Sequence, residues 1–257
     1  MSLRFAILGS GSQGNALVVE AGSTRLLLDC GFAASETVRR LALRGLAPAD
    51  LSGILVTHEH DDHIGGVARF ARKHKLPVWI TPGTLRGLEP LFEGIAALHL
   101  IEGYAPLCIG DVEVRPFPVP HDAREPAQYV FGDGAARLGV LTDVGCITPW
   151  IQSMLAACDA LVLECNHDPG LLFSSDYPPP LKQRISSRFG HLDNQAAAAL
   201  LGAMPAGRLR HVVAAHLSQS NNRPDLARGA LAAALNCTPD WIAVADQDSG
   251  LDWRMVS

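Results

Sequence analysis

The sequence Thr57-His58-Glu59-His60-Asp61-Asp62-His63 places three imidazoles and a group of carboxylates on one turn. The apolar run 53–56 before it predicts a β-strand, and residues 64–72 after it can form a helix. Histidine is the commonest metal ligand in proteins, and carboxylates beside it add negative charge. The turn therefore predicts a metal site supplied largely by one loop. A zinc-protease helix is excluded, because His-Glu-x-x-His needs a histidine where this chain has Asp62.

Length and composition predict one globular domain spanning residues 1–257. A chain of 257 residues can bury a sizeable core, and 48% apolar with 18% charged residues excludes a disordered class. No window of about 18 apolar residues exists, so we expect no membrane partner. The apolar run 3–8 ends at Gly9 and is too short for a signal peptide. Six cysteines without a C-x-x-C pair predict buried free thiols and a cytoplasmic protein.

The charge distribution leaves two readings open. A formal net charge of −5 argues against a protein that coats nucleic acid. Residues 182–228 nevertheless contain seven basic and two acidic residues, a local net charge of +5. This asymmetry is compatible with a phosphate-binding face and equally with solvated helix faces. The composition does not indicate an oligomeric state.

Hydrophobic patterning predicts many strands with helices between some of them, which is typical of α/β or α+β proteins. Strands are expected at 3–8, 15–20, 24–29, 53–56, 77–81, 97–101, 112–119, 128–142, 160–164, 211–215 and 241–246. Helices are expected at 35–45, 64–72, 148–158, 178–189, 195–201 and 224–235, with Asp193 as the cap of the helix at 195–201. The Gly-rich turn 9–15 is interpreted as a hairpin loop, because a strand follows it where a dinucleotide site would have a helix.

Further polar residues follow apolar runs elsewhere in the chain. His121, Asp143 and His216 each come at the end of a predicted strand, and Asp29 ends another. Each alone is explained by a turn, a cap or a surface loop. Strand ends on one edge of a sheet can converge, so together they extend the predicted metal site.

The spacing His-x-His-x-Asp-His resembles the signature of the metallo-β-lactamase-fold superfamily. The resemblance implies a four-layer αββα sandwich and two divalent ions, with zinc, manganese and iron left open. It assigns His58, His60 and His121 to one ion, Asp62, His63 and His216 to the other, and Asp143 as the bridge. Asp29 would support the metal loop by orienting ligand imidazoles.

The same resemblance implies hydrolysis by a metal-bridging hydroxide. Two ions about 3.5–4 Å apart lower the pKa of a shared water and hold a phosphoryl oxygen. Asp62 would orient that water or take its proton. A leaving alkoxide needs an acid, and His191 is the first candidate, because phosphodiesterases of the superfamily place a histidine between the bridging Asp and the last His. His167 is the competing candidate.

Later motifs narrow the resemblance to the YycJ-type (WalJ-like) subfamily, which is related to ribonuclease Z and is regarded as a group of DNA exonucleases acting from 5′ ends. The motifs are Glu164-Cys165-Asn166-His167-Asp168, Gly190-His191-Leu192-Asp193-Asn194 and His216-Leu217-Ser218-x-x-Asn221-Asn222. DNA is the substrate that this resemblance implies. The residues expected to contact it are Ser10, Ser12, Asn15, His167, Arg184, Arg188, Ser218, Asn221 and Asn222.

Two other functions remain to be separated from this one. A hydrolase of small cyclic phosphodiesters, thioesters or lactones would use the same water, and the acidic overall charge suits such substrates. A non-enzymatic module with a structural metal is disfavoured, because seven ligands for two ions differ from a closed four-ligand site.

Overall fold

The computed structural model describes residues 2–257, and in these residues the strands form two sheets of seven. One sheet has the order β14-β1-β2-β3-β4-β5-β6, formed by β14 Leu251–Met255, β1 Arg4–Gly9, β2 Ala16–Ala21, β3 Thr24–Leu28, β4 Gly53–Leu55, β5 Val78–Ile80 and β6 Leu98–Leu100. The other has the order β13-β12-β11-β10-β9-β8-β7, formed by β13 Ala243–Val244, β12 His211–Ala215, β11 Ala160–Glu164, β10 Arg137–Leu141, β9 Ala127–Gly132, β8 Val112–Pro118 and β7 Leu107–Ile109.

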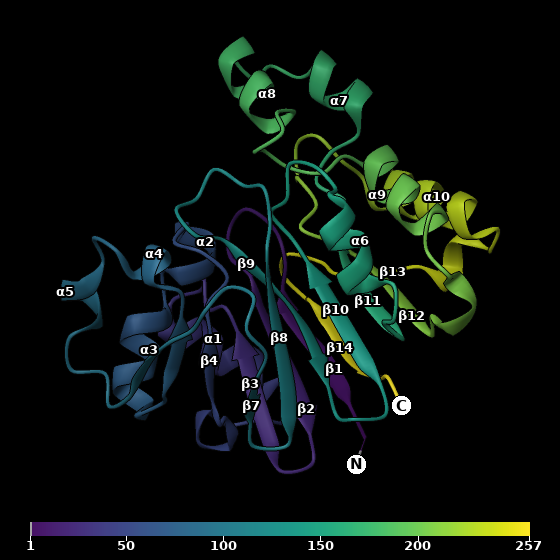
Figure 1. Cartoon of the computed structure of the whole chain (residues 1–257). Coiled ribbons are helices and arrows are strands. Elements are labelled where there is room, and N and C mark those ends of the chain that lie inside the picture. The colour runs from purple at the N-terminus through teal and green to yellow at the C-terminus, as the bar shows by residue number, and fades with distance from the viewer. Residues whose placement is uncertain (1) are drawn as a thin grey trace.

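The helices cover the outer faces of the two sheets (Figure 1). The α-helices are α1 Ala34–Ala42, α2 Asp61–Ile64, α3 Val67–His74, α4 Pro82–Leu85, α5 Glu89–Phe92, α6 Pro149–Leu155, α7 Pro169–Ser174, α8 Pro179–Ile185, α9 Asn194–Gly202 and α10 Pro224–Leu235. Short 3₁₀ helices are η1 Pro48–Asp50, η2 Ala206–Arg208 and η3 Pro239–Trp241.

Alternating side chains along the strands explain the layers. In β1, Phe5 and Ile7 join the core between the sheets, whereas Leu8 joins the core beneath α1 and α3. In β11, Val162 faces the inter-sheet core and Leu161 packs with the cluster that contains residues of α6, α9 and α10. Successive residues of a strand point to opposite faces, so a strand that is apolar throughout needs a covering layer on both sides. This confirms the predicted four-layer αββα sandwich.

The predicted elements differ from the structure mainly near the C-terminus. The strand expected at 241–246 is reduced to β13, and the chain closes with β14, which was not predicted. β14 pairs antiparallel with β1 at the edge of the first sheet. Its residues are half-buried or exposed, so it carries no strong apolar pattern. β7, α4, α5 and α7 were also missed, and they are three to six residues long.

Glycines and turns divide two of the predicted elements. The expected helix 64–72 begins only at Val67, because Gly65 and Gly66 separate α3 from α2. A Cβ at Gly66 would meet the Phe32 carbonyl at 2.0 Å, so the chain approaches too closely for another side chain. The region 128–142 is a hairpin of β9 and β10. The basic helix expected at 178–189 ends at Ile185 as α8.

The carboxyl ends of the parallel strands lie at one edge of the sandwich. β3 is parallel to β4, and β10, β11 and β12 are parallel to one another. Their last residues lead into the segments that contain Asp29, His58, Asp143, Glu164 and His216. α7 and α8 stand apart from the sandwich beyond this end (Figure 1). The topology therefore gathers residues that are far apart in the sequence.

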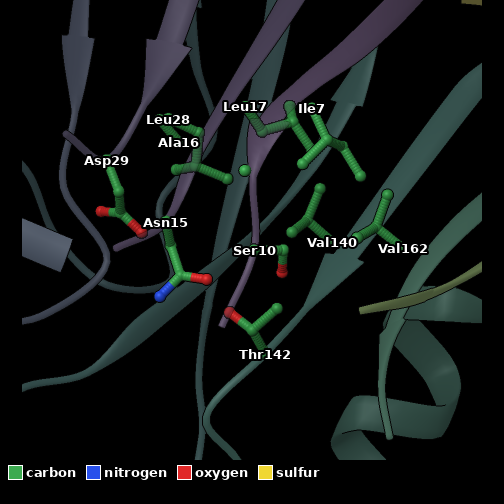
Figure 2. A pocket seen from close by; sticks show the side chains of 11 residues that line it. Ile7, Ser10, Asn15, Ala16, Leu17, Leu28, Asp29, Val140, Thr142 and Val162 are labelled. Atoms are coloured by element: carbon green, nitrogen blue, oxygen red, sulfur yellow. The ribbon is translucent and has the colours of Figure 1, made fainter. Parts of the chain in front are cut away.

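A small pocket between the sheets reaches toward this edge (Figure 2). Its walls are apolar, with Ile7, Val140 and Val162 among them, whereas Asp29 and Asn15 line it on the side of the metal loop. Both of these polar side chains also contact His63. Asp29 and Asn15 therefore form the polar end of the inter-sheet core, and they support the loop that contains His63.

Cysteines and helix lengths test two further predictions. All six cysteines are free in the structure, but only Cys30, Cys158 and Cys165 are buried, so the prediction of buried thiols is correct for these three. Among the helices within residues 2–257, none is both long enough and apolar enough to cross a membrane.

Candidate metal centre

The side chains predicted to bind metal converge at the carboxyl edge of the strands. The groups whose ligand atoms lie within 4.8 Å of one another include His58, His60 and His121; Asp62, His63 and His216; and His58, His63 and Asp143. Asp143 joins the first two groups, because its Oδ2 lies 3.0 Å from His63 Nε2 and its Oδ1 lies 4.0 Å from His121 Nε2. The structure thus brings together the two ligand sets and the bridge that the sequence predicted.

Hydrogen bonds that Asp29 accepts fix the tautomer of the first ligand. Thr57 donates its hydroxyl to Asp29 Oδ2 over 2.8 Å, so its oxygen must accept from His58 Nδ1 at 2.9 Å. His58 therefore carries its proton on Nδ1 and presents a bare Nε2 lone pair. Asp29 Oδ2 also lies 2.7 Å from His63 Nδ1, which leaves Nε2 as the ligand atom of His63. One buried carboxylate orients two of the predicted ligands.

The remaining imidazoles are oriented by acceptors on other elements. His121 Nδ1 donates to the Gly190 carbonyl at 3.0 Å, and His216 Nδ1 donates to Glu164 Oε1 at 3.1 Å. Both rings therefore direct Nε2 into the cluster. His60 presents its Nδ1, which lies 3.2 Å from His121 Nε2. Ring nitrogens of several histidines that face one another form an arrangement that suits a cation.

One buried polar atom indicates that the cluster fits metal ions. His58 Nε2 is buried and has no hydrogen-bond partner among residues 2–257. A buried polar atom without a partner costs about 1–3 kcal/mol, and this cost is removed when the atom coordinates a cation. The donors are imidazole nitrogens and carboxylate oxygens, which suit zinc, manganese or iron. The residues present thus fit divalent ions.

The carboxylates make the cluster strongly attractive to positive charge. Burial acts to lower the pKa of His63 and His216, but Asp143 raises the pKa of both above the ordinary value, to about 10 for His216. Burial also acts to raise the pKa of Asp143, and His216 and His63 hold it well below its usual range. The buried anions therefore need cations, and imidazolium ions supply them when metal is absent.

Backbone strain coincides with the cluster. Asp29, Asp143 and His216 have φ values of 59°, 52° and 55°. L-residues adopt this left-handed region at a cost of about 1–2 kcal/mol. The other non-glycine residues in this region, Lys75 and Asn236, end α3 and α10, where the conformation is usual. Strain at three strand ends around one site indicates functional positioning.

Glu164 is a site residue that the sequence prediction missed. It is fully buried at the end of β11, and its Oε1 accepts from His191 Nδ1 at 2.8 Å as well as from His216. Its Oε2 accepts from the backbone N–H groups of Val144 and Leu192. The signal was present in the sequence, because Glu164 ends an apolar run in the same way as Asp29.

His191 lies at the cluster, whereas His167 is set back from it. The His191 ring centroid lies 5.3 Å from that of His121 and 5.4 Å from that of His216. Burial acts to lower the pKa of His191, but Glu164 raises it above the ordinary value. His167 is buried, belongs to none of the metal-binding groups found in the described residues, and has a pKa lowered by burial. Its carbonyl instead accepts from Asn194 N at the start of α9.

The loop 9–15 joins the antiparallel strands β1 and β2, as predicted for a hairpin loop, and it is also part of the floor of the site. Ser10 Oγ accepts from His216 N at 2.8 Å. Asn15 N donates to the Asp62 carbonyl, and the Asn15 amide nitrogen lies 3.1 Å from His63 Nε2. Both residues are buried, so they hold the ligands in place and are poorly exposed to substrate. Ser12 is exposed.

The polar residues after His216 fold their own loop. Ser218 Oγ accepts from Asn221 N, and Ser218 N donates to the Asn166 carbonyl. Asn222 exchanges hydrogen bonds with Asn194 and donates to the Cys165 carbonyl. All three predicted substrate contacts in this loop, Ser218, Asn221 and Asn222, are at most 9% exposed. Their hydrogen bonds join the ends of β11 and β12, and direct contact with substrate stays a prediction.

The basic segment 182–228 does not form one face. Arg184 Nε donates to Asp122 Oδ2 at 2.6 Å beside the metal cluster, and Arg188 is exposed. Arg208 instead pairs with Asp159, which lies immediately before β11 and hence at the other end of that strand from the site. A five-residue strand spans about 16 Å, so the +5 charge is split between the two ends of the sandwich.

Known proteins are similar to this chain in both sequence and fold. The Beta-lactamase superfamily domain family matches residues 24–216. An exodeoxyribonuclease YycJ of Bacillus anthracis is 37% identical over 91% of this chain and 90% of its own length. An exodeoxyribonuclease WalJ of Streptococcus pneumoniae is 32% identical over 99% of this chain and 94% of its own length. The crystal structure of the metallo-β-lactamase fold protein YhfI from Bacillus subtilis superposes with a TM-score of 0.74 at 16% identity, covering 99% of this chain and 100% of its own.

Proposed function

The chain belongs to the metallo-β-lactamase superfamily, and from this membership we propose that it is a dinuclear metal-dependent exodeoxyribonuclease. The observation that carries the proposal is the convergence of imidazole nitrogens with Asp62 and Asp143. Two divalent ions held there would supply an activated water and neutralise charge on a phosphoryl oxygen. His58, His60 and His121 would hold one ion, Asp62, His63 and His216 the other, and Asp143 both.

The chain's own residues prepare this reaction. Asp29 and Glu164 fix the ligand tautomers, so that ring nitrogens need no rearrangement when an ion binds. Asp62 is the least buried ligand carboxylate, with 23% of its side chain exposed against 2% for Asp143. It is therefore the carboxylate that can orient the attacking water or accept its proton.

His191 supplies the proton for the leaving group. The Nδ1–H group of His191 donates a hydrogen bond to Glu164, so Nε2 is the position from which a proton can be transferred to the leaving group. Burial acts to lower the pKa of His191, but Glu164 raises it above the ordinary value, which favours the protonated ring. As the attacking oxygen bonds to phosphorus and the bond to the leaving oxygen breaks, that oxygen takes the proton from Nε2 and departs as a neutral alcohol. We assign this role to His191 and not to the buried His167.

DNA is the proposed substrate because relatives named exodeoxyribonucleases match over nearly the whole chain. The alternative is a hydrolase of small cyclic phosphodiesters, thioesters or lactones, and the division of the basic segment between two ends favours it. A DNA substrate and free thiols suit the cytoplasm.

The decisive experiment compares substrates on metal-loaded protein. We expect 5′-labelled DNA to be shortened to mononucleotides, with slower turnover of a cyclic phosphodiester, a thioester and a lactone. Parallel assays with zinc, manganese and iron identify the active metal. Turnover of a small ester without degradation of single-stranded or duplex DNA at low salt would replace the nuclease proposal by the alternative.

Salt dependence tests the arginines that lie at the site. Arg188→Ala should weaken DNA binding and reduce the salt slope by about 1, because each phosphate contact releases counterions. Arg184→Ala combined with it should reduce the slope further while a small phosphodiester turns over as before. Arg208→Ala is the matched control at the far end of the sandwich. A slope that responds equally to Arg208 would contradict a DNA path over the site.

A further inference from the structure

Several exposed aromatic rings have no part in the proposed hydrolysis. Phe189 is 58% exposed, Phe173 in α7 is 84% exposed, and Trp150 at the start of α6 is 51% exposed. Single exposed apolar residues are common on protein surfaces, so exposure alone carries no function. The attachment of Phe189 to the site distinguishes it from the others.

The main chain around Phe189 is bonded to the metal-binding cluster. The Phe189 carbonyl accepts from Asp122 N at 2.9 Å. Asp122 Oδ1 lies 3.5 Å from His121 Nε2, and the carbonyl of the next residue, Gly190, accepts from His121 Nδ1. His191, the proposed acid, follows directly. The Phe189 ring thus projects from a backbone that joins a metal ligand to the acid.

Close packing holds this backbone in place. A Cβ on Gly145 would lie 2.3 Å from the Arg188 carbonyl carbon and 2.5 Å from Phe189 N. A Cβ on Gly190 would lie 2.2 Å from the Arg184 carbonyl oxygen. His191 N also donates to the Ile185 carbonyl at 2.8 Å. The loop is therefore fixed against the segment that follows Asp143, and the backbone that carries the exposed ring is held in place.

The arginines beside the Phe189 ring indicate the class of ligand. Arg188 is exposed next to Phe189 in the chain, and Arg184 lies at the cluster on Asp122. Sites for unpaired DNA combine cationic side chains for phosphates with aromatic rings for bases, because every base offers a π face. A small ester or a lactone would offer neither a stacking base nor a row of phosphates.

We propose that the ring of Phe189 is a stacking platform for one unpaired nucleobase of the DNA strand next to the scissile phosphodiester, with Arg188 beside that strand's phosphate. The inference rests on the proposed nuclease function and adds which form of the DNA, paired or unpaired, is the substrate. The nucleotide at the metal centre must be unpaired to stack, so a frayed or single-stranded end is the form that reacts.

Abasic substrates test the stacking directly. The substrates are single-stranded oligonucleotides, intact or with a tetrahydrofuran abasic residue at the first, second or third nucleotide. The proteins are wild type, Phe189→Ala, Phe189→Leu and Phe189→Trp, with Phe173→Ala as the matched exposed control. Metal content and thermal melting confirm that each variant is folded and loaded.

The expected pattern is a non-additive loss. Wild type should lose about tenfold in kcat/KM when the base is absent at one position, and Phe189→Ala should lose the same factor on intact DNA with no further loss on that abasic strand. Phe189→Leu should behave like Phe189→Ala, Phe189→Trp should have the activity of wild type on intact DNA, and Phe173→Ala should match wild type on both substrates.

Other outcomes separate this inference from the nuclease proposal. If wild type degrades intact and abasic strands equally, or if Phe189→Ala still discriminates between them tenfold, Phe189 is not the platform while the nuclease proposal stands. The same non-additive loss in Phe173→Ala would also remove Phe189 from the role. If wild type degrades no DNA, both proposals fail.

Discussion

Replacement of Glu164 by glutamine tests how one buried carboxylate serves both the metal centre and the acid. Glu164 accepts four hydrogen bonds, two from His191 and His216 through Oε1 and two from Val144 N and Leu192 N through Oε2. A carboxylate can accept all four, whereas an amide has one accepting oxygen and one donating nitrogen. Glutamine therefore cannot satisfy both pairs.

Each orientation of the glutamine has a calculable cost. With its oxygen toward the imidazoles, two buried backbone N–H groups lose their acceptor, at about 1–3 kcal/mol each. With its nitrogen toward the imidazoles, both rings must move their proton to Nε2, and His216 then lacks a lone pair for the metal. Loss of an orienting partner weakens metal binding by about 10–100-fold. The pKa of His191 also falls, because Glu164 raises it. Loss of the acid lowers turnover by about 10²–10⁴-fold.

The assay measures bound metal, thermal stability and turnover on alkyl and nitrophenyl phosphodiesters for Glu164→Gln. Asp159→Asn is the matched control, because Asp159 lies immediately before β11, at the opposite end from Glu164, and pairs with Arg208. We expect metal affinity and turnover of the control to remain within about threefold of wild type, because asparagine can still accept from Arg137 N and only the ion pair with the exposed Arg208 is lost. Unchanged stability, metal affinity and leaving-group dependence in Glu164→Gln would refute the argument that this carboxylate orients both rings.

Three further predictions concern the metals and the acid. His58→Ala and Asp143→Ala should each lose at least one of two bound ions by elemental analysis, and unchanged stoichiometry in both would contradict the ligand assignment. His191→Ala should keep its metals but lose most turnover of an alkyl phosphodiester, with partial recovery on a nitrophenyl ester that needs less protonation; equal losses on the two substrates would remove the acid role. Metal titration in a weakly buffered solution should release protons, because Asp143 raises the pKa of His63 and His216 against the effect of burial and keeps both rings protonated without metal. Affinity should therefore fall as pH falls, and a pH-independent affinity between about pH 6 and 8 would show that the rings are already neutral.

The sequence by itself determined the fold class, and it predicted the candidate ligands that the structure brings together. Strands that are apolar along almost their whole length, such as residues 4–9 and 160–164, require covering layers on both faces, and the structure has them. The spacing of His58, His60, Asp62 and His63 reflects local geometry, because a strand end and a helix start place neighbouring side chains around one point. The predicted cap by Asp193 is likewise local, and its Oδ1 accepts from Gln195 N and Ala196 N.

Only the tertiary structure decided which polar residues serve the site and which serve the fold. Asn221 and Asn222 resemble substrate contacts in the sequence, yet burial and hydrogen bonds join them to neighbouring loops. Glu164 resembles an ordinary strand end, yet it orients two imidazoles. The positions of the basic residues also depend on the tertiary structure. Arg184 and Arg208 belong to one basic segment but lie at opposite ends of the sandwich. The partners of a side chain depend on which strand ends meet at one edge of a sheet. Pairing between strands far apart in the sequence decides which ends meet, and the pairing of β14 with β1 is an example.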